Sequence, residues 1–330
     1  MIHSAPSVSK ECLLTMNIVV LDAATLAGVS LDPLRKFGTV TEYDTTSAEQ
    51  LMSRIQSAEV VVTNKVVLNA DTLSQLPNLR LICVAATGTN NIDLEAARAH
   101  NIAVTNVAGY STPSVVLHTF TLLGNLMSNI HRYAQDCANG AWQRSDLFCR
   151  LDYPIHDLSG KRFVIVGYGN LGQAVAKVAS AFGAEVVIAE RPGQETVRAE
   201  RVEFTEALRS ADIVSIHCPL TDTTRDLFDA DTLALLPAHA ILLNTARGGI
   251  VNEQALADVL ASKQLLGAGV DVLSVEPAAA DNPLVQYQGN NLLLTPHTAW
   301  ASQESITRLI QGIAENIDSF LQGREHNRLV

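Results

Sequence analysis

Three short segments of the chain contain residues that could together move a proton to or from a carbonyl oxygen. NTARGG carries Arg247, DVLSVEP carries Glu276 and TPHTAW carries His297. Hydride reduction of a ketone needs a proton donor, a positive charge for the oxygen and any carboxylate, and a group that keeps the donor protonated. A lone histidine after a proline is more often a packing or surface residue. The three residue types together predict acid–base chemistry on a carbonyl or hydroxyl group.

A glycine-rich segment upstream predicts a dinucleotide site. In VIVGYGNLGQAVA, Gly167, Gly169 and Gly172 form GxGxxG between an apolar run and a helix-forming run. The first glycine would permit a tight turn, the second would let the backbone approach a pyrophosphate, and the third would let the helix pack on the strand. A Gly-rich turn without a ligand is the alternative. The strand before it and the helix after it favour the dinucleotide, whose phosphates would face the helix N-terminus.

A carboxylate at the end of the next expected strand indicates which dinucleotide binds. Glu190 lies where such folds place the acceptor for the adenosine ribose hydroxyls, and it would repel a 2′-phosphate. Arg191 follows directly and could attract that phosphate instead, or it could be a solvated loop charge. We therefore expect NAD as the cofactor and consider NADP the less favoured alternative.

The candidate residues follow short apolar runs that are typical of parallel strands. In the second part of the chain the expected strands are 162–166, 185–189, 213–217, 240–244, 267–272 and 291–294. In a doubly wound sheet the ligands bind at the carboxyl ends of the strands, where Glu190, Arg247 and His297 would lie. An earlier series of expected strands, 17–21, 39–43, 60–63, 79–84 and 102–105, predicts a separate α/β unit without a dinucleotide motif.

Two helices mark the boundaries between these parts. A long apolar helix is expected over 115–130, and Ser111, Thr112 and Pro113 indicate its start. An amphipathic helix over 304–321 follows the last strand and could pack back on the first part. The chain therefore crosses between two α/β units near residue 113.

The composition excludes several classes of function. The chain has 330 residues, is 47% hydrophobic and 17% charged, and carries a formal net charge of −11. This acidic balance argues against nucleic acid and against anionic membrane surfaces as partners. Five dispersed cysteines without metal-ligand spacing favour reduced thiols in the cytoplasm, no metal site and no disulfide framework. Residues 1–15 lack the features of a signal or transit peptide, and we expect a plain extension.

Seven motifs occur in the order and spacing of one known family: VAATGTNNIDLEAA, TNVAGYST, VGYGNLG, SIHCPLTDTTR, LLNTARGGIVNEQAL, GAGVDVLSVEP and LTPHTAW. The chain after Met16 thus resembles the D-isomer-specific 2-hydroxyacid dehydrogenases. The resemblance implies two doubly wound parallel-sheet α/β domains. One is a flavodoxin-like substrate-binding domain, residues 1–112 and 301–330, and the other is a Rossmann NAD-binding domain, residues 113–300. It also implies a homodimer through the NAD-binding domains, for which the helix from Ser114 and the loop 142–153 are candidate surfaces.

The resemblance assigns a role to each candidate residue. Arg247 would bind the carboxylate and carbonyl oxygen of a small 2-oxo acid, His297 would be the general acid and base, and Glu276 would pair with His297. The backbone amides of the loop containing Ala86, Thr87 and Gly88 would receive the substrate carboxylate. The remaining cofactor contacts would come from Asn170, Leu171, Cys218, Pro219, Thr245, Ala246 and Asp271, together with Arg247 and His297. Cys218 would be a packing residue and not a nucleophile.

Within the family, several segments are more similar to glycerate dehydrogenases, also called hydroxypyruvate reductases, than to other branches. They include VVLDAATL, DLFCRLDYPIHDLSGK and VLSVEPAAADNPL. Trp300 after the catalytic histidine would shape the substrate pocket or a subunit contact, or it could be a buried anchor. Glyoxylate, D-lactate and phosphoglycerate remain alternative substrates, and an NAD-sensing corepressor-like binding module is the non-enzymatic alternative.

One segment departs from the family pattern. At Val116 and Leu117 family members commonly have an alanine and an acidic or amide residue. His118 follows, and because a lone histidine in an apolar helix is more often a satisfied core residue, it is not assigned to the catalytic set.

Overall fold

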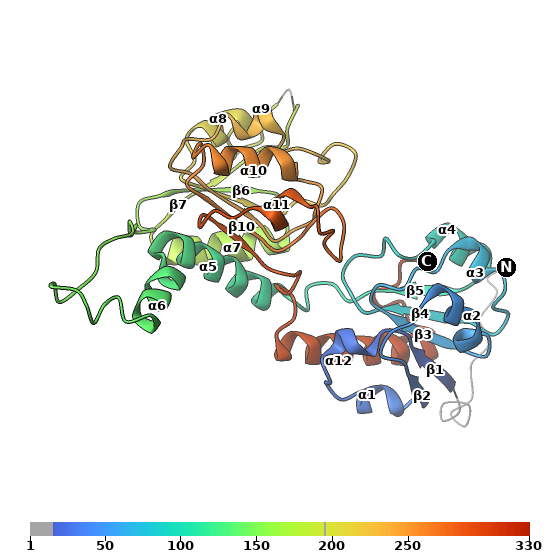
Figure 1. Cartoon of the computed structure of the whole chain (residues 1–330). Coiled ribbons are helices and arrows are strands. Elements are labelled where there is room, and N and C mark those ends of the chain that lie inside the picture. Colours follow the sequence, from blue (N-terminus) through green and yellow to red (C-terminus); the bar gives the residue numbers. More distant parts are fainter. Residues whose placement is uncertain (1–15, 195) are drawn as a thin grey trace. The chain divides into compact units, whose positions relative to one another are not determined.

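The computed structural model describes residues 16–194 and 196–330, and strands alternate with helices along most of this chain (Figure 1). The residues divide into two compact units. Unit 1 joins the residues up to Ser111 with Ala301–Val330, and unit 2 is Thr112–Trp300. The extension expected at residues 1–15, including Cys12, lies outside the described residues.

Unit 1 contains a five-stranded parallel sheet in the order β2-β1-β3-β4-β5. This is the strand order of flavodoxin-like folds. Its strands are β1 (Met16–Val20), β2 (Gly38–Glu42), β3 (Val60–Thr63), β4 (Leu81–Val84) and β5 (Ala103–Thr105). Its helices are the 3₁₀ helix η2 (Ala23–Leu26) and α1 (Asp32–Arg35), α2 (Ala48–Ile55), α3 (Ala70–Leu73), α4 (Leu94–Ala99) and α12 (Gln303–Leu321).

The C-terminal helix α12 belongs to unit 1, as its amphipathic pattern predicted. It packs against α1 and β4 (Figure 1). Its apolar face is fully buried at Ile306, Leu309 and Ile313. Ser302 caps its start, where the Oγ atom accepts a hydrogen bond from the backbone N–H of Ser305 at 3.1 Å. Both ends of the chain therefore contribute to one α/β unit.

Unit 2 contains a six-stranded parallel sheet in the order β11-β10-β9-β8-β6-β7. The strands are β6 (Arg162–Val166), β7 (Glu185–Ile188), β8 (Ile213–Ile216), β9 (Ile241–Asn244), β10 (Gly267–Val270) and β11 (Leu292–Leu294). The helices are α5 (Thr112–Ser128), α6 (Ile130–Ala138), α7 (Asn170–Ala181), α8 (Phe204–Arg209), α9 (Ala230–Leu233), α10 (Glu253–Ala261) and α11 (Pro283–Gln286).

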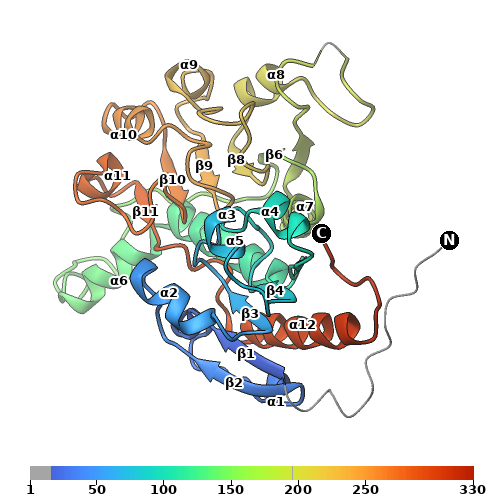
Figure 2. The same ribbon diagram turned by 90° about the vertical axis from the view of Figure 1, so that its right-hand side faces the viewer.

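A single parallel bridge between Ala189 and Val202 stands beside β7 in place of a further strand. When this bridge is counted in chain order, the sheet has the order of a Rossmann fold, and the winding direction reverses between β6 and β8. Buried residues of α8, α9, α10 and α11 cover one face of the sheet (Figure 2), and those of α5 and α7 cover the other. The expected fold class, two doubly wound α/β domains, is confirmed.

The long helix expected over 115–130 is wrong at its C-terminal end. It ends at Ser128, Asn129 takes a left-handed backbone conformation with φ 52°, and α6 then starts at Ile130. Asparagine tolerates this conformation better than most residues. The Asn129 Nδ2 atom donates to the carbonyl of Pro154 at 2.7 Å and so fixes the change of direction. Apolar periodicity continues across the break, which explains why the sequence pattern did not reveal it.

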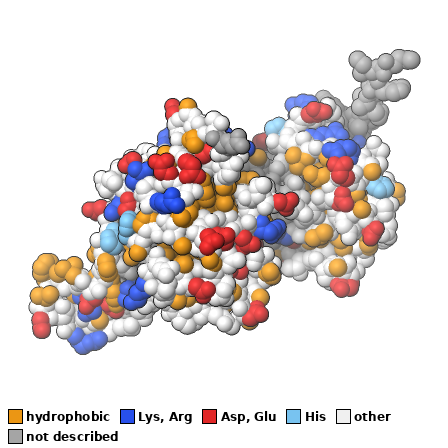
Figure 3. Space-filling view, turned by 90° about the horizontal axis from the view of Figure 1, so that it is seen from above, with side chains coloured by type: hydrophobic (Ala, Val, Ile, Leu, Met, Phe, Trp, Pro, Cys, Tyr) orange, Lys and Arg blue, Asp and Glu red, His pale blue; other side chains and the backbone are white. Residues whose placement is uncertain are grey.

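The segment after α6 exposes large apolar side chains. Leu147, Phe148 and Leu151 are 65%, 92% and 76% exposed, and Trp142 and Ile155 are also exposed. This segment projects from unit 2, and Figure 3 shows hydrophobic side chains gathered there, at the left of the view. We call residues 142–155 the arm. Within the described residues, no helix has both the length and the apolar character that a membrane crossing requires.

Candidate active site

The three glycines of the GxGxxG motif form a turn between β6 and α7. Gly167 has φ 97°, and a Cβ atom there would lie 2.4 Å from the backbone nitrogen of Cys218. A Cβ atom on Gly172 would lie 2.1 Å from the carbonyl oxygen of Gly167. A Cβ atom on Gly169, in contrast, would meet no atom within 4 Å. Gly167 and Gly172 therefore permit close packing, whereas Gly169 faces open space at the start of α7.

This open space suits a pyrophosphate. Gly169 is the N-cap of the twelve-residue helix α7, whose first turn contains Asn170 and Leu171. The N–H groups of a first helical turn have no partner within the helix, and the helix dipole favours an anion there. A glycine leaves room for the phosphate oxygens to approach the backbone. The residues present thus fit the phosphate groups of a dinucleotide.

The loop after β8 lies against this glycine turn, at the position where the sheet reverses its winding. It contains His217, Cys218 and Pro219. Burial raises the pKa of the Cys218 thiol to about 11, which disfavours the reactive thiolate. Burial also lowers the pKa of His217 to about 3, and its Nε2 atom lies 2.8 Å from Ser215 Oγ. Within the described residues its buried Nδ1 atom has no hydrogen-bond partner. The sequence analysis did not single out His217.

Glu190 follows β7 and is surrounded by hydrogen-bond donors of the protein. Its side chain is only 2% exposed, and its carboxylate pairs with the guanidinium of Arg198. It also accepts hydrogen bonds from the backbone N–H groups of Arg191 and Arg198, at 2.7 and 3.0 Å. These bonds, the Arg198 side chain first, hold the pKa of Glu190 well below its ordinary value. The side chain of Arg191 is exposed.

The structure brings His297 and Glu276 together. His297 Nδ1 lies 2.7 Å from Glu276 Oε2, and the two side chains are 24% and 34% exposed. The other carboxylate oxygen of Glu276 accepts the backbone N–H of Leu273 at 3.0 Å, which holds the carboxylate in place. Because Nδ1 faces the carboxylate, Nε2 is the imidazole nitrogen that remains for a substrate.

Arg247 follows β9, the neighbour of β10 in the sheet. It is exposed, and its Nη1 atom donates to the carbonyl of Ala246 at 2.6 Å. Ala246 and Thr245 are buried, and Thr245 Oγ1 lies 3.1 Å from Thr119 Oγ1 of α5. Arg247 therefore presents a positive charge at the carboxyl edge of the sheet, as its motif predicted.

The turn that carries His297 is held by a buried carboxylate. Asp271 is 1% exposed and accepts hydrogen bonds from Thr295 Oγ1 at 2.6 Å, Thr298 N–H at 3.0 Å and Ala299 N–H at 2.9 Å. His297 itself has φ 54°, a left-handed conformation that is unfavourable for most residues with a side chain. Its N–H donates to the carbonyl of Asp271 at 2.8 Å. Asp271 was predicted as a cofactor contact, and its hydrogen bonds position the turn that carries His297.

Two further side chains support the same turn. His118 Nε2 lies 2.9 Å from Thr295 Oγ1 and 3.4 Å from Asp271 Oδ1. Trp300 Nε1 donates to the carbonyl of His297 at 2.9 Å. His118 was not among the predicted site residues, because a lone histidine in an apolar helix is more often a satisfied core residue. No local pattern in the sequence indicates its contact with Thr295.

The predicted substrate loop, Ala86 to Gly88, follows β4 in unit 1. The carbonyl of Ala86 accepts Val107 N–H at 3.1 Å, and the carbonyl of Thr87 accepts Asn106 Nδ2 at 2.7 Å. Thr87 Oγ1 also donates to the Val107 carbonyl at 3.2 Å. Within the described residues, these bonds leave the N–H groups of Thr87 and Gly88 without a protein acceptor. The loop can therefore donate to an anion.

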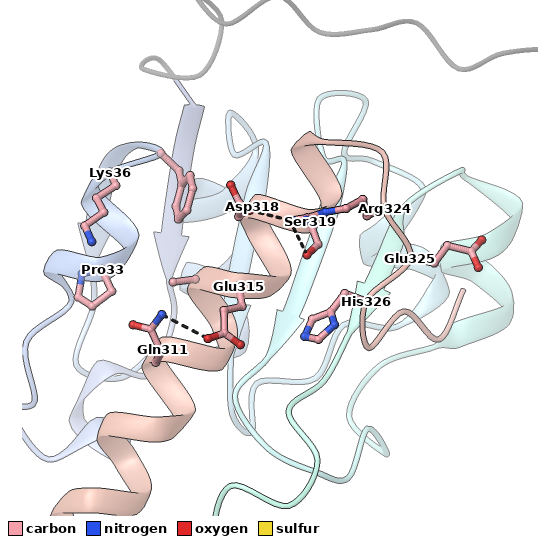
Figure 4. A pocket seen from close by; sticks show the side chains of 11 residues that line it. Pro33, Lys36, Gln311, Glu315, Asp318, Ser319, Arg324, Glu325 and His326 are labelled. Carbon is pink, nitrogen blue, oxygen red and sulfur yellow. Dashed lines mark hydrogen bonds and ion pairs between the residues drawn. The ribbon is translucent and has the colours of Figure 1, made fainter.

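Each unit also contains a cavity that is lined by other residues. One, of about 480 Å³ in unit 1, is lined by residues of α1, α12 and the segment that follows α12, including Lys36, Glu315 and Arg324 (Figure 4). The other, of about 560 Å³ in unit 2, includes Ile241 and Gly267, the first residues of β9 and β10. It thus lies at the opposite ends of the strands from Arg247 and His297.

Comparisons with known proteins identify the family of the chain. Residues 120–299 match the model of the NAD-binding domain of D-isomer-specific 2-hydroxyacid dehydrogenases. A glycerate dehydrogenase of Methylorubrum extorquens is 38% identical over 95% of this chain and 99% of its own length. A hydroxypyruvate reductase of Blautia hydrogenotrophica is 36% identical over 94% of this chain and 99% of its own length.

Solved structures with the same fold include a relative of similar identity. The TT0316 protein of Thermus thermophilus superposes with a TM-score of 0.82 at 31% identity, covering 96% of this chain and 100% of that one. The chain therefore belongs to the D-isomer-specific 2-hydroxyacid dehydrogenase family and is an NAD-dependent oxidoreductase.

Proposed function

We propose that the chain is a hydroxypyruvate reductase, which interconverts hydroxypyruvate and D-glycerate with NAD(H). The observation that carries the proposal is the 2.7 Å contact between His297 Nδ1 and Glu276 Oε2. This contact fixes the orientation of the His297 ring, which is the proposed proton donor. The names of the Methylorubrum and Blautia relatives support the choice of substrate among the 2-hydroxy acids.

The reduction needs one proton for the carbonyl oxygen of the 2-oxo acid. NADH, when bound, supplies the hydride for C2 of the 2-oxo acid. His297 donates the proton from Nε2 to the carbonyl oxygen, because its Nδ1–H is held by Glu276. Glu276 stabilises the positive imidazolium before the transfer and fixes the ring orientation afterwards. In the oxidation of D-glycerate the neutral imidazole takes the proton back.

The substrate is held by its charge. The exposed guanidinium of Arg247 binds the carboxylate and polarises the carbonyl oxygen. In unit 1, the N–H groups of Thr87 and Gly88, in the loop that begins at Ala86, are donors that can receive a carboxylate without a competing counterion. Trp300 contributes to the pocket wall and, through its bond to the His297 carbonyl, holds the catalytic turn.

The cofactor would bind at the carboxyl edge of the unit 2 sheet. Gly167, Gly169, Gly172 and the N–H groups of Asn170 and Leu171 would hold the pyrophosphate. Glu190 would lie at the adenosine ribose, with NADH as the favoured form. Cys218 and Pro219 would contact the adenosine, and Thr245, Ala246 and Asp271 would contact the nicotinamide half. The open space at Gly169 supports this placement.

We also propose a cytoplasmic homodimer. The exposed apolar side chains of the arm form a surface that a second copy would cover, since patches of this kind are rarely left exposed in monomers. The free thiols of Cys83, Cys137, Cys149 and Cys218 agree with a reducing compartment.

The experiment that tests the function is a substrate panel. The loss of NADH absorbance is followed with hydroxypyruvate, glyoxylate, pyruvate and 3-phosphohydroxypyruvate, each titrated to obtain kcat/KM. We expect the highest kcat/KM with hydroxypyruvate and lower values with glyoxylate, which lacks the hydroxymethyl group, and with pyruvate, which lacks the hydroxyl, because each loses contacts that the pocket makes with that group. A clear preference for another acid would replace the substrate and keep the mechanism. Tight NADH binding with no turnover of any acid would favour a binding module instead.

A further inference from the structure

The carboxylate of Glu190 is fully occupied by hydrogen bonds. An ionised carboxylate has about four acceptor positions. In Glu190 they face the N–H of Arg191, the N–H of Arg198, and the Nε and Nη2 atoms of the Arg198 side chain. A ribose hydroxyl could bond to this carboxylate only by displacing one of these donors.

The loop that carries Arg198 is anchored at both ends. Glu190 N–H donates to the carbonyl of Val202 at 2.7 Å, and Ala189 forms the parallel bridge with Val202. Residues 191–194 and 196–201 thus lie outside the sheet, and the chain pairs with the end of β7 again at Val202. This closure places Arg198 over the carboxylate.

Three arginine residues surround or follow Glu190 and offset its negative charge. The side chain of Arg198 is 48% exposed, so one side of its guanidinium still faces water. The Nη1 atom of Arg201 lies 3.8 Å from Glu190 Oε1. Arg191, which follows Glu190 in the chain, is exposed. A 2′-phosphate near Glu190 would therefore meet at least as much positive as negative charge.

We propose that Arg198 sets how strongly the chain distinguishes NADH from NADPH. By holding Glu190, Arg198 cancels most of the repulsion that this carboxylate would exert on a 2′-phosphate, and its exposed side offers a partner for that phosphate. The dissociation constants of NADH and NADPH then differ little, and the difference in favour of NADH increases when Arg198 is removed. This inference rests on the proposed function, because it assumes that the dinucleotide binds at the Gly167–Gly172 turn.

The test is equilibrium binding, which does not depend on turnover. Dissociation constants for NADH and NADPH are measured by the change of nicotinamide and tryptophan fluorescence. For the wild type we expect the two constants to lie within about tenfold of each other. Arg198→Met should raise the NADPH constant by roughly tenfold or more, since a cation a few ångströms from a doubly charged phosphate is removed, and should change the NADH constant by less than about threefold.

Two further variants keep the test decisive. Arg209→Met removes the same charge from an exposed position at the end of α8 and should leave both constants unchanged. The double change Glu190→Gln with Arg198→Met removes both members of the ion pair and should return the NADPH constant to within a few-fold of the wild type.

Three outcomes would overturn the inference. One is a wild-type preference for NADH above about a hundredfold that Arg198→Met does not widen. Another is an equal rise of both constants in that variant. In both cases NADH still binds, and the proposed function stands. The third is a wild-type chain that binds neither dinucleotide, which would overturn the proposed function as well.

Discussion

Replacing Asp271 by asparagine tests whether one buried carboxylate positions the catalytic turn. Asp271 accepts hydrogen bonds from Thr295, Thr298 and Ala299, and two of these come from backbone N–H groups. An asparagine can keep one acceptor oxygen, but its NH2 group must face a donor that the carboxylate previously accepted. The variant thus loses a charge-assisted hydrogen bond and leaves a buried donor unpaired, at a cost of about 3 kcal/mol.

This cost has two measurable results. In a unit of this size, about 3 kcal/mol lowers the Tm by roughly 6–12 °C. The turn that carries His297 also shifts, and because a misplacement of about 1 Å can cost about a hundredfold in rate, kcat should fall far more than NADH affinity. Differential scanning fluorimetry, steady-state kinetics and NADH binding are compared with Asp258→Asn, an exposed control on α10. A Tm within about 1 °C of the wild type and an unchanged kcat would refute this account of Asp271.

Three further predictions concern the cofactor turn, the thiols and the arm. Gly169→Ala should keep its Tm, because the added Cβ meets no protein atom within 4 Å, yet raise the NADH dissociation constant; Gly172→Ala, whose Cβ would lie 2.1 Å from the carbonyl oxygen of Gly167, should lower the Tm by several degrees. Equal Tm values for both variants in thermal melts would contradict this packing. At pH 8 iodoacetamide should label exposed Cys137 much faster than Cys218, whose pKa of about 11 leaves roughly 0.1% thiolate, and the Cys218 rate should rise about tenfold per pH unit towards pH 10. Comparable labelling of the two cysteines at pH 8, read by peptide mass spectrometry, would be inconsistent with the buried thiol. Phe148→Ser should shift a dimer towards monomer in sedimentation velocity, and a wild type that is already monomeric at micromolar concentration would rule out the arm as a dimer surface.

The strands of both sheets were predictable from the sequence because they are short runs rich in apolar and β-branched residues, and several, such as β3 and β9, are buried along their whole length. Every expected strand is present with its ends shifted by at most two residues, for example β4 at Leu81–Val84. The break at Asn129 was not predictable, since apolar residues continue on both sides of it and the left-handed residue is stabilised by the distant Pro154 carbonyl.

The candidate site was predictable as a set of residue types, but its hydrogen bonds were not. The contact of Glu276 with His297 was expected from the resemblance to the family. The left-handed turn at His297, the support from His118 and the pairing of Glu190 with Arg198 involve side chains whose partners no local pattern specifies. A carboxylate at the end of a strand looks the same in sequence whether it faces a ribose or an arginine.

The most direct test of the central claim is the activity of His297→Ala. The wild type and the variant are assayed with NADH and hydroxypyruvate, with Tm and the NADH dissociation constant measured on both as controls. If His297 is the proton donor, kcat/KM falls by roughly 10²–10⁴-fold, while Tm and NADH binding stay close to the wild type. Turnover within a few-fold of the wild type would show that another group supplies the proton and would contradict the account.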